Sequence, residues 1–252
     1  MRKNTQSPVR SRVRSPLFVE ALEGRQFLSA TIGATDGLTP SAATVATSAK
    51  VVVGSTATIL GQTQTLQIRV SATSGTPRGT IQLVNGRTNM GIEGTLNRFG
   101  RVTFTFDAGR ALYVGNYKVS ARYLGNSTFV GTKSPIVRFD VNAPTLTNAG
   151  NGLRYATVTT GRGRAAQPGA MITAQYTGFD ANTGVMFDQS SNHAPGTFSF
   201  QLYANPQQVI AGFDQGTRGM RTGEVRVLVI PSNLGYNDGL TRIFVLKLVS
   251  LA

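Results

Sequence analysis

The chain has 252 residues, of which 40% are hydrophobic and 14% are charged, and its 25 Lys and Arg against 11 Asp and Glu give a net charge of +14. This length and apolar content exclude a disordered chain and favour two compact β-rich modules. No run of about 18 apolar residues occurs, which excludes a transmembrane helix. Because the chain has no cysteine and a single histidine, we expect no metal site, no cofactor and no thiol or Ser-His-Asp catalysis.

Residues 1–45 form a basic amino-terminal segment and a linker. Five basic residues precede the first acid, and these are Arg2, Lys3, Arg10, Arg12 and Arg14. Glu20, Glu23 and Arg25 interrupt what would be the apolar part of an ordinary secretory signal. The string VEALEGRQFLSA resembles the short LExRxLLSA-type segment of many secreted and surface proteins of planctomycete-like bacteria, which implies an extracellular or cell-surface location. The alternative is a basic tail that contains an amphipathic turn by chance.

In residues 46–143, apolar residues recur with a period of two, which predicts β-strands. The alternating sets are Leu66, Ile68 and Val70; Ile81 and Leu83; Val102, Phe104 and Phe106; Tyr117, Val119, Ala121 and Tyr123; and Val137, Phe139 and Val141. Lys118, Ser120 and Arg122 lie between members of the fourth set, which predicts one buried and one solvated face. The pair Asn85-Gly86 favours a type I′ hairpin turn. Short strands at this spacing predict an all-β sandwich.

The stretch GNYKVSARYLGNSTFVGTKSP within this module resembles the closing strands of bacterial Ig-like repeat domains. That resemblance implies a spacer or adhesive stalk. The module carries 11 basic and 3 acidic residues, a net charge of +8, and its cations stand singly along the strands, as at Arg69 and Arg101. A solvated basic face is the simplest interpretation, so we expect no nucleic-acid partner, while an anionic surface polymer stays open as an alternative.

Residues 144–151 are rich in Asn, Gly and Pro and predict a linker before a second module over residues 152–252. Branched apolar residues predict three strands in that module, over 171–176, 225–230 and 243–249.

A single short helix is predicted in the second module. Asn205-Pro206 is typical of an N-cap followed by proline at the first helical position, and the helix would run through Phe213. Val209 and Phe213 are four residues apart and would share one helical face. One short helix against a bent antiparallel sheet is an α+β architecture.

Several segments of the second module resemble the FKBP-type peptidyl-prolyl cis-trans isomerases, in order and nearly in spacing. They are GAMITAQYTGFDANTGVMFDQS, FSFQL, QQVIAGFDQGTRGMRTGEVRVLVIPSNLGY and IFVLKLVSL. The resemblance implies an α+β FKBP-like fold, an isomerase that acts on proline-containing polypeptide clients, and no metal. Catalysis of X-Pro rotation suits a chain with neither thiol nor metal cluster, because an apolar pocket that favours the twisted amide needs no nucleophile.

The resemblance also implies the site residues. The catalytic set would be Tyr176, Phe187, Asp188, Phe213 and Tyr236, and the substrate-binding set would be Phe198, Val209, Ile210 and Phe244. Phe213 would form the pocket floor, Tyr236 would donate to the substrate carbonyl, and Ile210 would offer its backbone for hydrogen bonding. Asp188, held by Tyr176, would polarise the pocket. Taken singly, each apolar residue is more typical of a core than of a site. Asp188 is equally typical of an Asx turn, and Tyr236 of a residue that caps a loop.

The chain departs from the family after Tyr236. Only four residues, Asn237-Asp238-Gly239-Leu240, separate Tyr236 from Thr241, so the usual overhanging loop is missing and Asn237 stands where the family has glycine. We expect a wider cleft, in which Tyr203 would form a substitute wall. The alternative function is that of a non-catalytic peptide-binding, chaperone or adhesive module. His193 lies in a polar loop and is expected to be solvated. The client proteins and the oligomeric state stay open.

Overall fold

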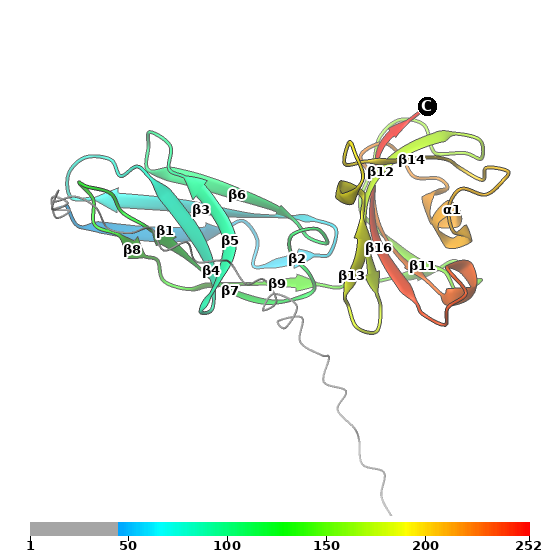
Figure 1. The fold of residues 1–252 in the computed structure, drawn as a ribbon, viewed down its shortest axis with the longest axis horizontal. Helices are drawn as coiled ribbons and strands as arrows, with labels where there is room; N and C mark the ends of the chain where they lie inside the picture. The colour runs from blue at the N-terminus through cyan, green and yellow to red at the C-terminus, as the bar shows by residue number, and fades with distance from the viewer. Residues whose placement is uncertain (1–44) are drawn as a thin grey trace, which may run out of the picture. The chain divides into compact units, whose positions relative to one another are not determined.

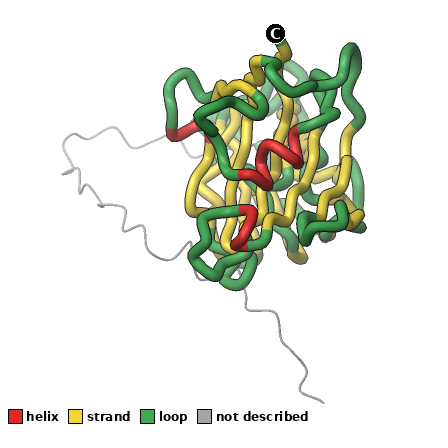
Figure 2. The backbone as a smooth tube through the Cα atoms, turned by 90° about the vertical axis from the view of Figure 1, so that its right-hand side faces the viewer, coloured by secondary structure: helices red, strands yellow, loops and turns green. Residues whose placement is uncertain are grey.

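The computed structural model describes residues 45–252, which form two β-rich modules (Figure 1). The segment that resembles an export signal falls on residues 1–44, outside the described part of the chain. Within the described part, no helix has both the length and the apolar character needed to cross a membrane. Figure 2 shows that strands and loops make up most of this part, with helix confined to short segments.

The first module contains two sheets. Its strands are β1 (Thr47–Val53), β2 (Ala57–Ile59), β3 (Thr63–Ala72), β4 (Thr80–Asn85), β5 (Thr88–Thr95), β6 (Arg101–Asp107), β7 (Gly115–Tyr123), β8 (Thr132–Lys133) and β9 (Val137–Asn142). One sheet has the order β1-β3-β6, and the other has the order β2-β9-β7-β4-β5 with β8 beside β7. The predicted all-β sandwich is confirmed, and only β2 and β9 pair in parallel among the described strands of this module.

Alternation along β7 places its apolar side chains in the core. Val119, Ala121 and Tyr123 are at most 1% exposed, while Lys118 and Arg122 are exposed. Ser120 differs from the prediction, because it is completely buried although it belongs to the outer set of side chains. It lies opposite buried Val84 of β4, so this part of the outer face is covered.

The hairpin between β4 and β5 is present, but its turn is shifted by one residue from the predicted type I′ pair. Asn85 stays in the strand and pairs with Thr88, so the two loop residues are Gly86 and Arg87. Gly86 has a φ of +61° and occupies the first central position. This is the glycine position of a type II′ turn, which also matches the twist of paired strands.

The second module is one curved sheet with a short helix on its concave side (Figure 1). Its elements are β10 (Thr147–Asn148), β11 (Arg154–Thr159), β12 (Met171–Asp180), β13 (Met186–Gln189), β14 (Phe198–Gln201), α1 (Ala211–Thr217), β15 (Val225–Ile230) and β16 (Arg242–Leu251), with 3₁₀ turns at Ser190–Asn192 and Ser232–Leu234. The sheet order is β10-β11-β15-β16-β12-β13, and β14 pairs with β12. Strand β10 lies within the predicted linker and pairs with β11.

The predicted helix exists, but it begins at Ala211 and not at Pro206. The start was wrong because side chains hold residues 202–210 as a loop. The Gln208 side chain accepts a hydrogen bond from the Gln201 N–H at 2.8 Å, and Asp214 accepts one from the Tyr203 N–H at 2.9 Å. Val209 therefore lies outside the helix and shares no helical face with Phe213.

Helix α1 packs very closely against β15 because two of its residues have no side chain. A Cβ atom on Gly212 would lie 2.4 Å from the Ile230 Cγ2 atom, and one on Gly216 would lie 2.5 Å from a methyl group of Leu228. At the other end of the helix, Arg226 donates hydrogen bonds to the Gly216 and Arg218 carbonyls. The close approach puts Phe213 against the sheet, where it is 4% exposed.

Replacing Gly212 with alanine should therefore destabilise the second module. Ile230 is β-branched and stiff, so it cannot rotate away from the new methyl group. We expect a loss of about 1–3 kcal/mol in the free energy of unfolding, measured with urea. Gly115→Ala is the control, since a Cβ there meets nothing within 4 Å. Equal urea midpoints for the two variants would contradict the close packing.

Candidate active site

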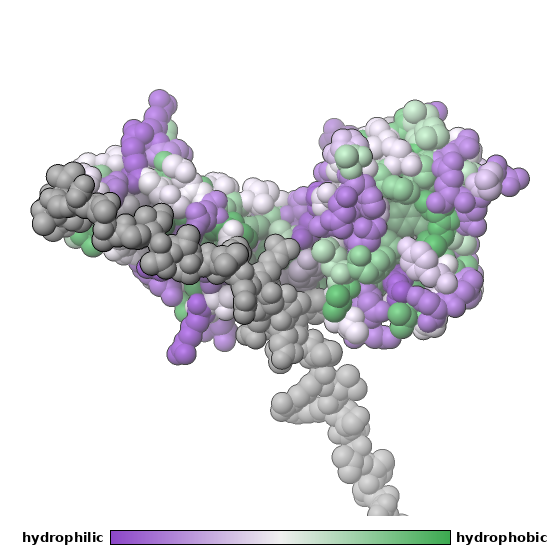
Figure 3. Space-filling view, viewed as in Figure 1, coloured by the Kyte–Doolittle hydropathy of each residue, from purple (hydrophilic) through white to green (hydrophobic). Residues whose placement is uncertain are grey.

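A cleft of about 560 Å³ opens between α1, the loop after β15 and strands β12, β14 and β16. Eight of the nine predicted site residues line it, and these are Tyr176, Asp188, Phe198, Val209, Ile210, Phe213, Tyr236 and Phe244. The other lining residues are Gln207, Gln208, Ala211, Asn233, Leu234, Gly235 and Asn237. Figure 3 shows hydrophobic surface in the middle of this module with hydrophilic surface around it.

The inner part of the cleft is aromatic. The ring of Phe213 lies 5.2 Å from that of Phe244 and 5.9 Å from that of Tyr176, and both pairs are edge-to-face. Phe198 meets Tyr176 edge-to-face at 5.9 Å. This geometry aligns the positive ring edges with the negative ring faces and fixes each ring. Phe213 thus forms an apolar floor between two walls.

Phe187 is the predicted site residue that does not line the cleft. It is 43% exposed, and its ring packs edge-to-face on Phe244 at 5.6 Å and on Tyr236 at 6.3 Å. The contact with Phe244 depends on Gly178, where a Cβ atom would lie 2.7 Å from Phe187 and 2.9 Å from Phe244. Phe187 therefore supports two cleft residues from outside.

Asp188 is the charged residue at the cleft wall, and its oxygens already have partners. The Tyr176 hydroxyl donates to Oδ2 at 2.5 Å, and the Gln189 N–H donates to Oδ1 at 2.8 Å. His193 Nε2 lies 3.3 Å from Oδ1, so the expectation of a merely solvated histidine was wrong. The 3₁₀ turn Ser190–Asn192 brings His193 back over Asp188.

Burial and hydrogen bonding set the protonation states around the cleft. Burial raises the pKa of Tyr176, and the hydrogen bond to Asp188 raises it further. Burial also raises the pKa of Tyr236, and the Asp188 charge adds to the effect. For Asp188 itself burial raises the pKa, but the hydrogen bonds that it accepts outweigh burial and bring the pKa below its usual value. At neutral pH both tyrosines are therefore protonated, and Asp188 is a carboxylate.

Two donors face the cleft without a partner inside residues 45–252. The Tyr236 hydroxyl makes no hydrogen bond there, and neither does the Ile210 N–H, although the Ile210 carbonyl accepts bonds from α1. Four carboxamides, Gln207, Gln208, Asn233 and Asn237, add polar groups at the rim. The cleft can thus bind an apolar ring and donate hydrogen bonds to the carbonyls beside it.

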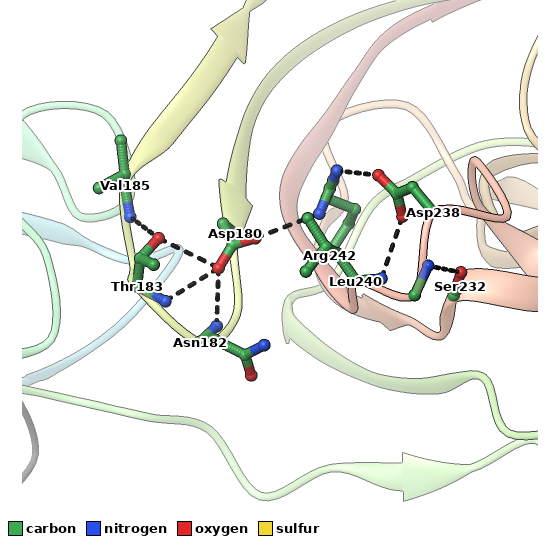
Figure 4. Close-up of polar contacts among 9 residues, drawn as sticks. Asp180, Asn182, Thr183, Val185, Ser232, Asp238, Leu240 and Arg242 are labelled. Carbon is green, nitrogen blue, oxygen red and sulfur yellow. Dashed lines mark hydrogen bonds and ion pairs between the residues drawn. The ribbon is translucent and has the colours of Figure 1, made fainter.

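Residues on the loop after Tyr236 are held by an arginine that the sequence did not single out. Arg242 forms ion pairs with Asp180, at 3.2 Å, and with Asp238 (Figure 4). Its guanidinium group also lies over the rings of Phe187 and Tyr236, at 5.2 Å and 5.7 Å from their centroids.

The backbone of this loop is also fixed. Asn237 has a φ of +57°, a conformation that asparagine tolerates better than most residues, which explains how it replaces the glycine of the family. Ser232 accepts a hydrogen bond from the Gly239 N–H at 2.7 Å (Figure 4). Tyr203, predicted as a substitute wall, does not line the cleft.

No cluster of three or more His, Asp or Glu side chains that could hold a metal ion occurs within residues 45–252.

The contribution of Asp188 to the stability of the folded chain should decrease as the pH falls. Its pKa is lowered in the folded state, so this stability is present above the unfolded pKa of about 3.9 and is lost as the pH falls through the folded value. The difference in urea midpoint between the parent and Asp188→Asn should be constant above about pH 5 and shrink below about pH 4. Tyr176→Phe, which removes the donor, should weaken this dependence. A difference that persists unchanged to pH 3 would contradict the assignment.

Comparisons with known proteins match both modules. Residues 51–142 match the bacterial Ig-like domains of group 3, and residues 162–242 match the FKBP-type peptidyl-prolyl cis-trans isomerases. An FK506-binding protein of Streptomyces anulatus is 42% identical over 101 residues, which cover 36% of this chain and 79% of that protein. A probable FK506-binding protein of Corynebacterium glutamicum is 34% identical over 98 residues, with 36% and 79% covered.

A third relative is the peptidyl-prolyl cis-trans isomerase FPR2 of Saccharomyces cerevisiae, which is 42% identical over 74 residues. The match covers 29% of this chain and 52% of the yeast protein. The two bacterial relatives are more than 30% identical and are covered over more than two thirds of their length. Through its second module, the chain belongs to the family of FKBP-type peptidyl-prolyl cis-trans isomerases.

Proposed function

We propose that the chain is an exported peptidyl-prolyl cis-trans isomerase that speeds X-Pro rotation in other exported or cell-surface polypeptides. Membership of the FKBP-type family supports the reaction. The observation that carries the proposal is the aromatic cleft with two unpaired donors, Tyr236 and Ile210, above a floor made by Phe213. The likeness of VEALEGRQFLSA to an export segment supports the setting. The Ig-like module would act as a spacer.

The chemistry of the cleft fits a rotation that breaks no covalent bond. The barrier to rotation is about 18–20 kcal/mol because twisting removes amide resonance. Twisting also moves charge away from the carbonyl oxygen, so a cleft with little water favours the twisted amide over the planar one. Since an enzyme accelerates a reaction by binding its transition state more tightly than its substrate, an apolar site of this kind is sufficient.

Each group in the cleft has a defined part in this scheme. The proline ring would rest on Phe213 between Tyr176 and Phe244, which holds one side of the rotating bond. The Ile210 N–H and the Tyr236 hydroxyl would hold carbonyl oxygens on the other side. The hydrogen bonds that Asp188 accepts leave it as a fixed charge that orients Tyr176.

The first test compares two tyrosines of the full chain. Tyr236→Phe removes a donor from the cleft, and we expect kcat/KM on an X-Pro peptide to fall about two- to tenfold, the cost of one hydrogen bond. Tyr203→Phe is the matched control, since Tyr203 is exposed and lies outside the cleft. Exchange spectroscopy by NMR gives the rates, and it also detects peptide binding.

Two outcomes would overturn the proposal. A folded parent chain with no rate above the spontaneous one would reject the enzymatic function. If such a chain still binds the peptide, the module is a peptide-binding or chaperone module instead. Acceleration that is lost equally in Tyr203→Phe and Tyr236→Phe would reject the assigned cleft.

Arg242 should position Tyr236 for this reaction without touching the substrate. Its ion pairs with Asp180 and Asp238 take the place of the longer loop of the family in fixing the rim. Arg242→Met keeps much of the side-chain volume but removes these pairs, and we expect kcat/KM to fall about tenfold, mainly through KM. Arg242→Lys should restore only part of the rate, because an ammonium group cannot stack flat on Phe187 and Tyr236.

The control for this experiment is Arg218→Met, since Arg218 is an exposed arginine outside the cleft. A purely structural role for Arg242 would lower the thermal midpoint and leave KM unchanged in the folded fraction. That result would remove Arg242 from the positioning of Tyr236.

A further inference from the structure

The register of the three-stranded sheet places three cations in one row across it. Lys50 of β1 lies directly opposite Arg69 of β3, and Arg69 lies directly opposite Arg101 of β6. All three side chains are exposed. We call Lys50, Arg69 and Arg101 the cation row. Because neighbouring strands are about 4.8 Å apart, the three backbone positions of the row span about 10 Å.

No carboxylate in the described part of the chain neutralises this row. All ion pairs found there belong to the second module. The acid on the same face of the sheet is Asp107, six residues along β6 from Arg101 and thus about 20 Å away. Asp107 is also engaged, since it accepts a hydrogen bond from Thr63.

Like charges directly opposite each other in a sheet lower its stability. Arg69 has such a neighbour on both sides, so the row is unfavourable for folding alone. The other sheet repeats the arrangement, with Lys118 opposite Arg138 and Arg122 opposite Lys133. Opposed cations thus lower the stability of both sheets. A bound anion that lies against the cations would explain why they are present.

We propose that the cation row binds an anionic polysaccharide, a linear chain of sugars that carry carboxylate or sulfate groups. Two of the three cations are arginines, whose planar guanidinium groups pair with such anions through two hydrogen bonds at once. The row is flanked by hydroxyl and amide side chains, among them Gln67, Ser71 and Thr103, which suit sugar hydroxyls. An extended chain that crosses the three strands can meet each cation in turn.

Other polyanions fit this face less well. Single-stranded nucleic acid is usually held by aromatic side chains that stack on the bases, and the outward positions of β1, β3 and β6 carry none. A membrane surface would favour a row of apolar side chains beside the cations, and Val52 is the single large apolar residue at those positions. The cation row belongs to the first module, so its binding of an anion does not require isomerase activity of the second module.

The experiment measures affinity and stability on the same variants of the full chain. The probes are heparin, which is sulfated, and polygalacturonate, which is carboxylated, with neutral dextran as the blank. Arg69→Gln should weaken binding about fivefold, the effect of one cation near an anionic surface. Binding by the parent should weaken steeply with salt.

The same substitution should make the module more stable. Removing Arg69 relieves repulsion from both of its neighbours, so the thermal midpoint should rise by roughly 2–5 °C. Arg69→Glu should lower the affinity more than Arg69→Gln does and raise the thermal midpoint more, because Glu would pair with Lys50 and Arg101. A loss of affinity together with a gain of stability distinguishes a binding role from structural damage.

The control is Arg87→Glu, which makes the same charge change in the exposed β4–β5 turn. It should retain most of the affinity, and isomerase rates should be equal in all variants. Equal affinity of Arg69→Glu and Arg87→Glu would overturn the proposal. Tighter binding of a single-stranded DNA probe, lost in Arg69→Glu, would replace the polysaccharide with nucleic acid.

Discussion

The close contact of a seven-residue helix with strand β15 is the constraint on which the cleft depends. A helix this short gains little from its own hydrogen bonds, so packing must hold it in place. Gly212 and Gly216 allow that packing, because side chains there would occupy the space of Ile230 and Leu228. The approach turns Phe213 toward Tyr176 and Phe244 and so creates the floor. The floor of the cleft therefore depends on two residues that have no side chain.

Patterns that are local in the sequence predicted most of the fold. A period of two identified the strands of the sandwich, since it reports which face of each strand is buried. Eight of the nine site residues that the resemblance to a family implied line the cleft, because its motifs fix which strand carries each ring. Phe187 was assigned to the same place, although its ring contacts Tyr236 and Phe244 from outside.

The same local patterns did not predict several side-chain contacts. The Asn205-Pro206 signal predicted the helix too early, because Gln208 accepts a hydrogen bond from the Gln201 N–H and Asp214 accepts one from the Tyr203 N–H, and these bonds hold a loop before the helix. His193 looked solvated because nothing in its neighbourhood in sequence indicates a turn toward Asp188. The role of Arg242 was not assigned either, since one of its two carboxylate partners, Asp180, lies 62 residues away.

Charge is used in opposite ways by the two modules. In the second module, Arg226 and Arg242 form ion pairs with acids, and the pairs of Arg242 fix the loop near the cleft. In the first module, strand register sets cation against cation, although exchanging one residue for Glu would have turned repulsion into attraction. The first module tolerates this repulsion, because buried apolar side chains and not surface charges supply most of its stability. The opposed cations of the first module therefore have no role in holding its fold, whereas the ion pairs of Arg242 hold a loop of the second module in place.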